Sequence, residues 1–132
     1  MKIRKARKED LKKLIELDKI SNKEIKWWAP MTKSEFVSLI KKGLVYVAEN
    51  DKELIAYLNG DIKEKQLILD NIYVRKEYRR KGIARELIKK FMSDCKKSKF
   101  KDLRIDCPER LRKFYEKFGF KTTALIMKRR LR

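Results

Sequence analysis

The stretch "VRKEYRRKGIARELIKKF", residues 74–91, combines a basic loop with the start of a helix. Residues 75–90 carry eight Lys or Arg and only two Glu, yet the small residues Gly82 and Ala84 interrupt this charge. Apolar residues follow Gly82 with helical spacing, whereas the residues before Val74 alternate as in a strand. The pattern therefore predicts a strand that ends at Val74, a short loop, and a helix that begins near Gly82.

The loop has the chemistry of an anion site. The first N–H groups of a helix have no partner inside the helix and carry partial positive charge, so they bind phosphate groups. A backbone can approach a phosphate closely only where side chains are small. Gly82 and Ala84 leave this space, and Arg79, Arg80 and Lys81 add positive charge. The alternative is a surface helix that begins at a permissive glycine and carries solvated charges.

Composition limits the class of protein. The 132 residues fit one domain, residues 1–132, and 42% hydrophobic residues are enough for a packed core. The net charge of +19 favours acidic or nucleic-acid-associated partners, or reflects a general enrichment in Lys. No membrane-spanning run or signal peptide is visible, and two cysteines form no disulfide framework, so we expect a cytoplasmic protein. The absence of histidine removes the commonest metal ligand and general base, so we expect no metal.

The pattern of the whole chain predicts a mixed α/β fold in the order β-α-α-β-β-β-α-β-α-β. Consecutive strands in the middle should pair antiparallel, and the strand–helix–strand unit after residue 66 should be parallel and right-handed. We therefore expect a mostly antiparallel sheet with helices on both faces. The expected strands are residues 2–6, 44–50, 53–60, 66–74, 102–107 and 122–131, and the expected helices are residues 9–20, 32–43, 82–97 and 109–118.

Two motifs resemble those of the GCN5-related N-acetyltransferase (GNAT) superfamily. The acetyl-CoA signature Arg/Gln-x-x-Gly-x-Gly/Ala is matched by Arg79, Gly82 and Ala84. The segment "KFYEKFGFK", residues 113–121, resembles the closing Tyr-Glu-Lys-x-Gly-Phe segment, and the predicted strand order is also that of the family. The stretch "RIDCPERLRKFYEKFGF" is similar to glucosamine-6-phosphate N-acetyltransferases. The resemblance implies transfer of an acetyl group from acetyl-CoA, a cosubstrate, to a primary amine by direct attack in a ternary complex.

The resemblance also implies where acetyl-CoA binds. Its pyrophosphate would lie on the backbone N–H groups of the loop, and its pantetheine arm would pair with the end of the preceding strand. One of these N–H groups would polarise the thioester carbonyl. The implied cofactor-binding residues are Ile72, Tyr73, Val74, Arg79, Arg80, Lys81, Gly82, Ile83 and Ala84.

Three residues are candidates for proton transfer. Tyr115 matches the family tyrosine that protonates the leaving thiolate, although it could simply pack. Asp70 lies two residues before Ile72, so on a regular strand the two side chains point to the same face of the sheet. We therefore expect Asp70 to have apolar neighbours and to act as the base, with a structural carboxylate as the alternative. Asp106, at the end of a short strand, matches a family aspartate close to the acetyl group. The next residue, Cys107, is expected to be small and buried.

The acceptor amine stays open between a small amine, such as a phosphorylated amino sugar, and a protein amine. Trp27 or Trp28 could line its cleft, pack, or make a dimer contact, and homodimers are common in the family. The alternative function is a basic binding module of the same fold that holds nucleic acid or another polyanion without turnover.

Overall fold

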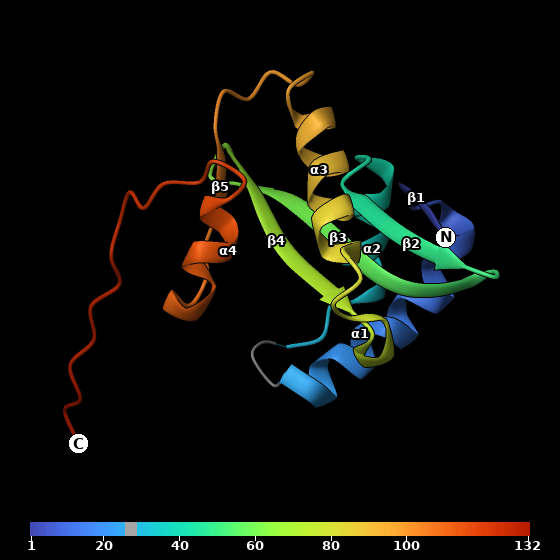
Figure 1. The fold of residues 1–132 in the computed structure, drawn as a ribbon, viewed down its shortest axis with the longest axis horizontal. Helices are drawn as coiled ribbons and strands as arrows, with labels where there is room; N and C mark the ends of the chain where they lie inside the picture. Colours follow the sequence, from blue (N-terminus) through green and yellow to red (C-terminus); the bar gives the residue numbers. More distant parts are fainter. Residues whose placement is uncertain (26–28) are drawn as a thin grey trace.

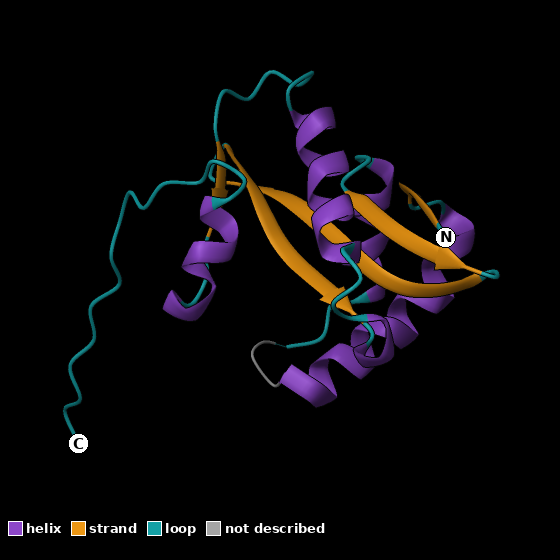
Figure 2. Ribbon diagram, in the orientation of Figure 1, coloured by secondary structure: helices purple, strands orange, loops and turns teal. Residues whose placement is uncertain are grey.

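The computed structural model describes residues 1–25 and 29–132, and the candidate cleft residues Trp27 and Trp28 lie outside this part. Figures 1 and 2 show a twisted sheet with helices packed on it. Short 3-10 turns precede α1, α3 and α4, at Lys8–Asp10, Lys76–Tyr78 and Glu109–Leu111. The main elements are β1 (Lys2–Lys5), α1 (Leu11–Ile25), α2 (Lys33–Lys41), β2 (Val45–Asn50), β3 (Glu53–Lys63), β4 (Gln66–Val74), α3 (Ile83–Cys95), β5 (Leu103–Ile105) and α4 (Arg112–Glu116).

The five strands follow one another across the sheet in chain order, from β1 to β5. The first four pair antiparallel, and β4 pairs with β5 in parallel through α3. Asp51 and Lys52 both have positive φ, 50° and 66°, in the turn between β2 and β3. A two-residue turn of this kind matches the twist of the strands that it joins. The predicted mixed, mostly antiparallel sheet is confirmed.

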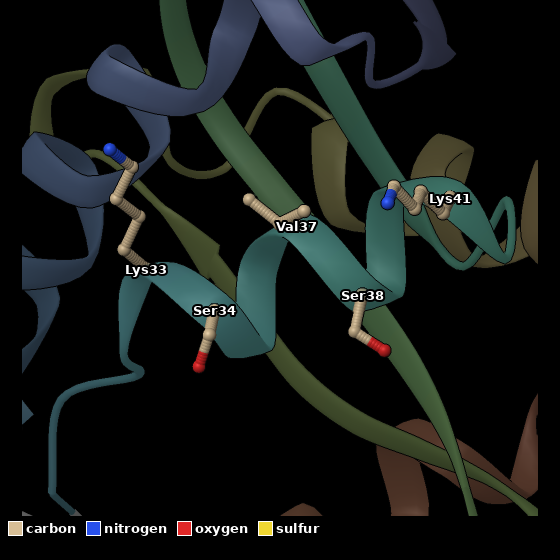
Figure 3. A pocket seen from close by; sticks show the side chains of 5 residues that line it. All are labelled: Lys33, Ser34, Val37, Ser38 and Lys41. Carbon is tan, nitrogen blue, oxygen red and sulfur yellow. The ribbon is translucent and has the colours of Figure 1, made fainter.

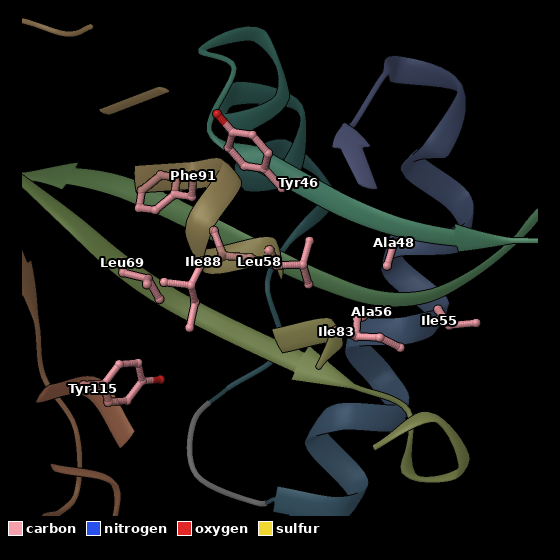
Figure 4. Close-up of a cluster of buried hydrophobic side chains, with 11 residues drawn as sticks. Tyr46, Ala48, Ile55, Ala56, Leu58, Leu69, Ile83, Ile88, Phe91 and Tyr115 are labelled. Carbon is pink, nitrogen blue, oxygen red and sulfur yellow. The ribbon is translucent and has the colours of Figure 1, made fainter. Parts of the chain in front are cut away.

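Helices cover both faces of the sheet, as predicted, and each face has its own core. On one face, α1 and α2 contribute Leu14, Leu17 and Phe36 to a cluster with inward-facing residues of β2 and β3. On the other face, α3 and α4 pack on the sheet, as Figure 4 shows. The labelled members of this second cluster are Tyr46, Ala48, Ile55, Ala56, Leu58, Leu69, Ile83, Ile88, Phe91 and Tyr115.

The start of α2 shows how local sequence sets a boundary. The Thr32 hydroxyl accepts a hydrogen bond from the Glu35 N–H at 3.1 Å, and the Glu35 carboxylate accepts one from the Thr32 N–H at 2.9 Å. This reciprocal arrangement satisfies two N–H groups that the first turn leaves free. Gly43, with φ of 71°, follows the end of this helix.

The prediction of a strand at residues 122–131 is wrong. Residues 121–132 have no regular secondary structure, and every side chain among them is exposed. Figure 1 shows this segment running away from the rest of the protein. A strand needs a neighbouring strand for its backbone N–H and C=O groups, and none lies beside this segment in the described chain. The observed order therefore ends with α4. None of the described helices has both the length and the apolar character that a membrane span requires.

Candidate acetyl-CoA and acceptor site

A bulge in β4 separates this strand from β5. Asn71 lies opposite Asn59 of β3, but Leu69 lies opposite Gly60, so Asp70 is an extra residue without a partner. A bulge bends its strand and breaks the regular ladder. β5 pairs only with residues 67–69 of β4, up to the residue before the bulge. From Asp70 onward, β4 has no neighbour on that side within the described residues, and Figure 1 shows the two strands diverging.

The free edge of β4 presents the backbone groups of Ile72 and Val74. The Arg75 N–H donates to a β3 carbonyl at 2.9 Å, so this amide faces β3. Amides along a strand alternate in direction, so that of Tyr73 also faces β3, whereas those of Ile72 and Val74 face the free edge. The Val74 carbonyl accepts a hydrogen bond from Arg79 Nε at 2.9 Å. Ile72 and Val74, rather than Tyr73, can therefore pair with an extended ligand.

The loop before α3 has a backbone that leaves N–H groups open. Gly82 lies at the helix start with φ of 79°, and Arg80 also has positive φ, 64°. A Cβ atom at Gly82 would meet nothing within 4 Å, so the space above the loop is open. Glu86 donates its N–H to the Gly82 carbonyl at 3.1 Å. The N–H groups of Ile83 and Ala84 come before this first turn and have no carbonyl of the helix to bond.

Arg79 does not simply add charge to the loop, because it is held by a cluster with Glu24 and Tyr73. Its guanidinium lies 2.6 Å from the Glu24 carboxylate and 5.5 Å from the centre of the Tyr73 ring. The Tyr73 hydroxyl donates to the same carboxylate at 2.7 Å. Hydrogen bonds from Tyr73 and then Arg79 lower the pKa of Glu24. Burial, followed by the bond to Glu24, raises the pKa of Tyr73 to about 12.

Glu24 was not found by sequence reasoning, and no local signal marks it. It stands at the end of α1, far along the chain from Tyr73 and Arg79, and only the fold brings the three together. The other two basic residues of the loop behave differently. Arg80 is exposed, and Lys81 lies over the Tyr78 ring, with Nζ 5.5 Å from its centre.

Tyr115 lies inside the core between α4 and the sheet. It is only 6% exposed, and it belongs to the cluster that contains Leu69, the residue before the bulge. Phe114 and Phe120 contact its ring edge to face, with ring centres 5.0 and 6.0 Å away. Figure 4 shows its hydroxyl directed away from α4. Burial raises the pKa of Tyr115 to about 12, so the hydroxyl keeps its proton at neutral pH.

Asp70 and Asp106 line the same hollow, of about 250 Å³, although they lie on different strands. Asp70 is 3.6 Å from Lys63, and its side chain is 31% exposed, so the expected apolar surroundings are wrong. The prediction assumed that side chains alternate regularly along β4. The bulge breaks this alternation, because Leu69 and Ile72 on either side of it lie in the same core cluster. The remaining lining residues are Lys63, Glu64, Ile68, Leu69 and Arg104.

Asp106 is held by Arg104. Nε and one terminal nitrogen of Arg104 donate to its two carboxylate oxygens at 2.9 and 3.0 Å. Cys107 is exposed, contrary to the expectation of a buried residue. Its pKa is nevertheless raised, by partial burial and then by Glu109 and Asp106, so the thiol is not an activated nucleophile.

A larger hollow, of about 540 Å³, lies along α2 on the opposite side of the sheet from α3. Figure 3 shows the five side chains that line it on successive turns of this one helix. They include no carboxylate, thiol or phenol, so this hollow offers no group for proton transfer at neutral pH. The lining residues are Lys33, Ser34, Val37, Ser38 and Lys41.

Comparison with known proteins agrees with this geometry. The model of the acetyltransferase (GNAT) domain matches residues 41–122. An aminoglycoside N-acetyltransferase solved in complex with CoA is similar over 99% of both chains, with 17% identity and a TM-score of 0.75. A predicted acetyltransferase from Clostridium acetobutylicum, solved with acetyl-CoA, has 17% identity and a TM-score of 0.74 over 98% of this chain and 95% of the other.

A ribosomal-protein-alanine N-acetyltransferase from Brucella melitensis biovar Abortus 2308 has 20% identity and a TM-score of 0.73 over 98% of both chains. A search of curated proteins found no match to the sequence. The structures establish the fold, and the family model covers more than half of the chain. The chain therefore belongs to the GNAT family of acetyltransferases, whose cosubstrate is acetyl-CoA.

Proposed function

We propose that this protein transfers the acetyl group of acetyl-CoA directly to a primary amine, with both substrates bound together. One observation supports this most strongly. The free edge of β4, at Ile72 and Val74, is followed directly by the loop before α3. This loop has unpaired backbone N–H groups, and no atom lies within 4 Å of a Cβ position at Gly82. An extended arm that ends in a pyrophosphate fits this sequence of backbone groups.

Each part of the site then has a role. Acetyl-CoA, when bound, supplies the activated thioester. The Arg79 N–H already donates to the Lys76 carbonyl at 3.3 Å. The loop N–H groups from Arg80 to Ala84 would hold the pyrophosphate, and the Ile72 and Val74 edge would hold the pantetheine arm. An N–H at this edge would donate to the thioester oxygen and stabilise the negative charge that develops there. The amine forms the new C–N bond as the C–S bond breaks, and the charge leaves on sulfur.

The amine must lose a proton, because an alkyl ammonium has a pKa of about 10. Asp70 is the better acceptor of this proton. It stands at the bulge, where β4 and β5 separate, and its only ion pair in the described chain is the loose 3.6 Å contact with Lys63. Asp106 is engaged at both oxygens by Arg104, which suits it to orient the ammonium group rather than to take the proton.

Tyr115 would stabilise the leaving thiolate. A thiol has an ordinary pKa of about 8.5, well below the value of about 12 for Tyr115. Full proton transfer from the phenol to sulfur is therefore unfavourable, whereas a hydrogen bond from a protonated phenol is always available. We assign Tyr115 this hydrogen bond, after which the thiolate takes its proton from solvent.

The hollow suggests an amine that also carries an anionic group. Asp70 and Asp106 suit an ammonium group, and the side chains of Lys63 and Arg104 in the same wall suit a phosphate or carboxylate. A screen should therefore compare glucosamine with glucosamine-6-phosphate and a peptide with a free N-terminus. Release of the CoA thiol measures turnover for each.

The deciding experiment is calorimetric titration of acetyl-CoA into the wild type and the Gly82→Glu variant. We expect saturable binding at one site by the wild type and at least tenfold weaker binding by the variant, because its side chain brings bulk and negative charge into the anion site. Circular dichroism checks that the variant is folded. The control is Glu109→Gln, in the 3-10 turn before α4, where Glu109 forms an exposed pair with Arg112.

Two salt concentrations separate this site from general attraction to a basic surface. Contacts to backbone N–H groups in one site should change little between 50 and 200 mM salt, whereas non-specific binding of a polyanion falls by orders of magnitude over about this range. Equal affinity of the wild type and Gly82→Glu, or no binding by the folded wild type, would overturn the proposal.

A further inference from the structure

The positive charge of the chain is unevenly distributed. Residues 75–101, which contain α3 and the loops on either side of it, carry twelve Lys or Arg but only three Asp or Glu, giving nine of the nineteen net positive charges. Residues 8–25, which contain α1 and the turn before it, carry five basic and five acidic residues. The two helices pack on opposite faces of the sheet (Figure 2), so one face is strongly basic and the other is balanced.

The outer side of α3 carries a row of exposed cations, Arg85, Lys89 and Lys96, which we call the α3 row. Lys96 directly follows the helix and keeps helical backbone angles. The spacing of four and then seven residues places all three side chains on one side of the helix. The row extends over about 16 Å along the helix axis. The buried residues of α3, on its opposite side, are Ile83, Leu87, Ile88 and Phe91.

The α3 row has no acidic partner in the described part of the chain. There, the ion pairs of residues 75–101 use Arg75, Arg79 and Lys90 instead. Arg85 and Lys89 are four residues apart on one helix, so their charges repel each other. A bound polyanion would relieve this repulsion, and the row is therefore suited to a ligand that carries several regularly spaced negative charges.

The chemistry of the outer side of α3 favours one class of polyanion. None of the exposed residues of α3 is apolar, so this side has nothing to insert into a lipid surface. None is aromatic, so it cannot stack the bases of a single strand. A nucleic-acid duplex carries its phosphates on the outside, with one negative charge per about 1.7 Å of axis, twice the density of a single strand. A straight row of cations without aromatic residues fits this duplex backbone best.

We propose that the α3 row binds the phosphate backbone of a nucleic-acid duplex. This surface is separate from the hollow that holds Asp70. Leu103 and Ile105 of β5 pack on the core cluster of α3, so Arg104 between them points to the other face of the sheet, where it lines the hollow. A duplex on α3 therefore leaves the hollow open, and the inference does not depend on acetyl transfer.

The test compares two sets of cations of equal charge on different helices. The first variant combines Arg85→Gln, Lys89→Gln and Lys96→Gln. The control variant makes the same change on α1, where three exposed lysines also lie on one side of the helix but Glu16 lies among them. Its substitutions are Lys12→Gln, Lys19→Gln and Lys23→Gln. Both variants lose three positive charges, so a difference between them reports the position of the charges and not their number.

Fluorescence anisotropy of labelled RNA and DNA duplexes of about 20 base pairs measures binding between 50 and 200 mM salt. The wild type should bind both duplexes with similar affinity, because the row contacts phosphates, and should bind a single strand of the same length more weakly. The α3 variant should have a Kd higher by about thirtyfold or more, and its plot of log K against log salt should be shallower by about 3. The α1 variant should change the Kd by less than about threefold and keep the slope of the wild type.

A third variant separates charge from side-chain shape. Arg85→Lys, Lys89→Arg and Lys96→Arg together keep the row positive and should bind a duplex as the wild type does. Circular dichroism checks that all three variants are folded. Equal weakening by the α3 and α1 variants would show that net charge alone attracts the duplex. That result, no saturable binding by the wild type, or a single strand that binds as tightly as the duplex would each overturn the proposal.

Discussion

The side chain of Arg79 is tied to the carbonyl of Val74, with 2.9 Å between Nε and the oxygen. This bond joins the loop before α3 to the last residue of β4. The guanidinium also pairs with Glu24 of α1, 2.6 Å away. The arginine of the acetyl-CoA signature therefore connects three parts of the chain, and it fixes the geometry of the loop before any ligand arrives.

Glu24→Gln should weaken acetyl-CoA binding moderately. The change removes the charge that holds Arg79, but the Glu24 side chain is 36% exposed and solvent already screens the pair. We expect the Kd to rise about twofold to fivefold, which corresponds to about 0.4–1 kcal/mol. Calorimetry measures this, with Glu109→Gln as the control for loss of one exposed acidic residue. An unchanged Kd would show that the cluster does not position the loop.

Gly82→Ala should lower the free energy of unfolding by about 1–2 kcal/mol. A Cβ there meets no atom, so the cost comes from the left-handed backbone alone. Arg80→Gly, two residues earlier at φ of 64°, should keep or raise stability because it relieves the same kind of strain. Urea unfolding compares the two variants. Equal stability of Gly82→Ala and the wild type would contradict the assigned backbone strain.

Tyr115→Phe should lower kcat by about 10²-fold while leaving the KM for acetyl-CoA nearly unchanged, because the ring still packs and only the hydroxyl is lost. The pKa of Tyr115 is raised to about 12, so its proton is present throughout neutral and mildly alkaline pH. Loss of this proton should therefore not lower the kcat of the wild type at any pH up to about 10.

Tyr46→Phe is the contrasting variant for this measurement. The Tyr46 hydroxyl donates to Asp94 of α3 at 2.6 Å, so its removal should reduce stability with little effect on kcat. If the Tyr115→Phe variant keeps the kcat of the wild type, the Tyr115 hydroxyl has no role in the reaction and the residue only packs in the core.

Asp10→Asn should destabilise the fold by about 2 kcal/mol, because Arg4 loses the closer of its two acidic partners. The Asp10 oxygens accept from Arg4 at 2.8 and 3.0 Å, and one also accepts from the Arg7 N–H at 2.7 Å. Burial acts to raise the pKa of Asp10, but these bonds outweigh it and the net pKa is lowered. The wild type should gain this stability above about pH 4 and lose it as pH falls through the lowered pKa.

Urea unfolding from pH 7 down to pH 3 checks the slope of this dependence, and Asp10→Asn should flatten it. Glu49→Gln, whose carboxylate is 3.3 Å from the same Arg4, is the control and should have a smaller effect. Equal pH slopes for the wild type and Asp10→Asn would contradict the assignment.

Local sequence was sufficient for most elements and for the position of the loop. The alternation of residues 66–74 and the glycine at position 82 each act over a few residues, so they can be recognised in the sequence itself. These patterns predicted the strand, the loop and the helix that carry the proposed acetyl-CoA site.

Local sequence patterns could not predict the bulge at Asp70, because the bulge depends on the neighbouring strand and helix. Gly60 lies opposite Leu69, and a Cβ atom at Gly60 would be 2.6 Å from the Phe91 ring of α3. The register of β3 and β4 is therefore set together with the packing of α3. As a result Asp70 shares a hollow with Lys63 and Asp106 instead of the apolar surroundings that simple alternation predicted.

The amino-acid sequence alone determined the class of fold, the family signature and the residues that could act, because these depend on local periodicity and on short motifs. Only the tertiary structure decided that Glu24 holds Arg79, that Ile72 and Val74 face a free edge, and that residues 122–131 form no strand. Each of these depends on contacts between distant segments, and a strand in particular exists only where a neighbour supplies its hydrogen bonds.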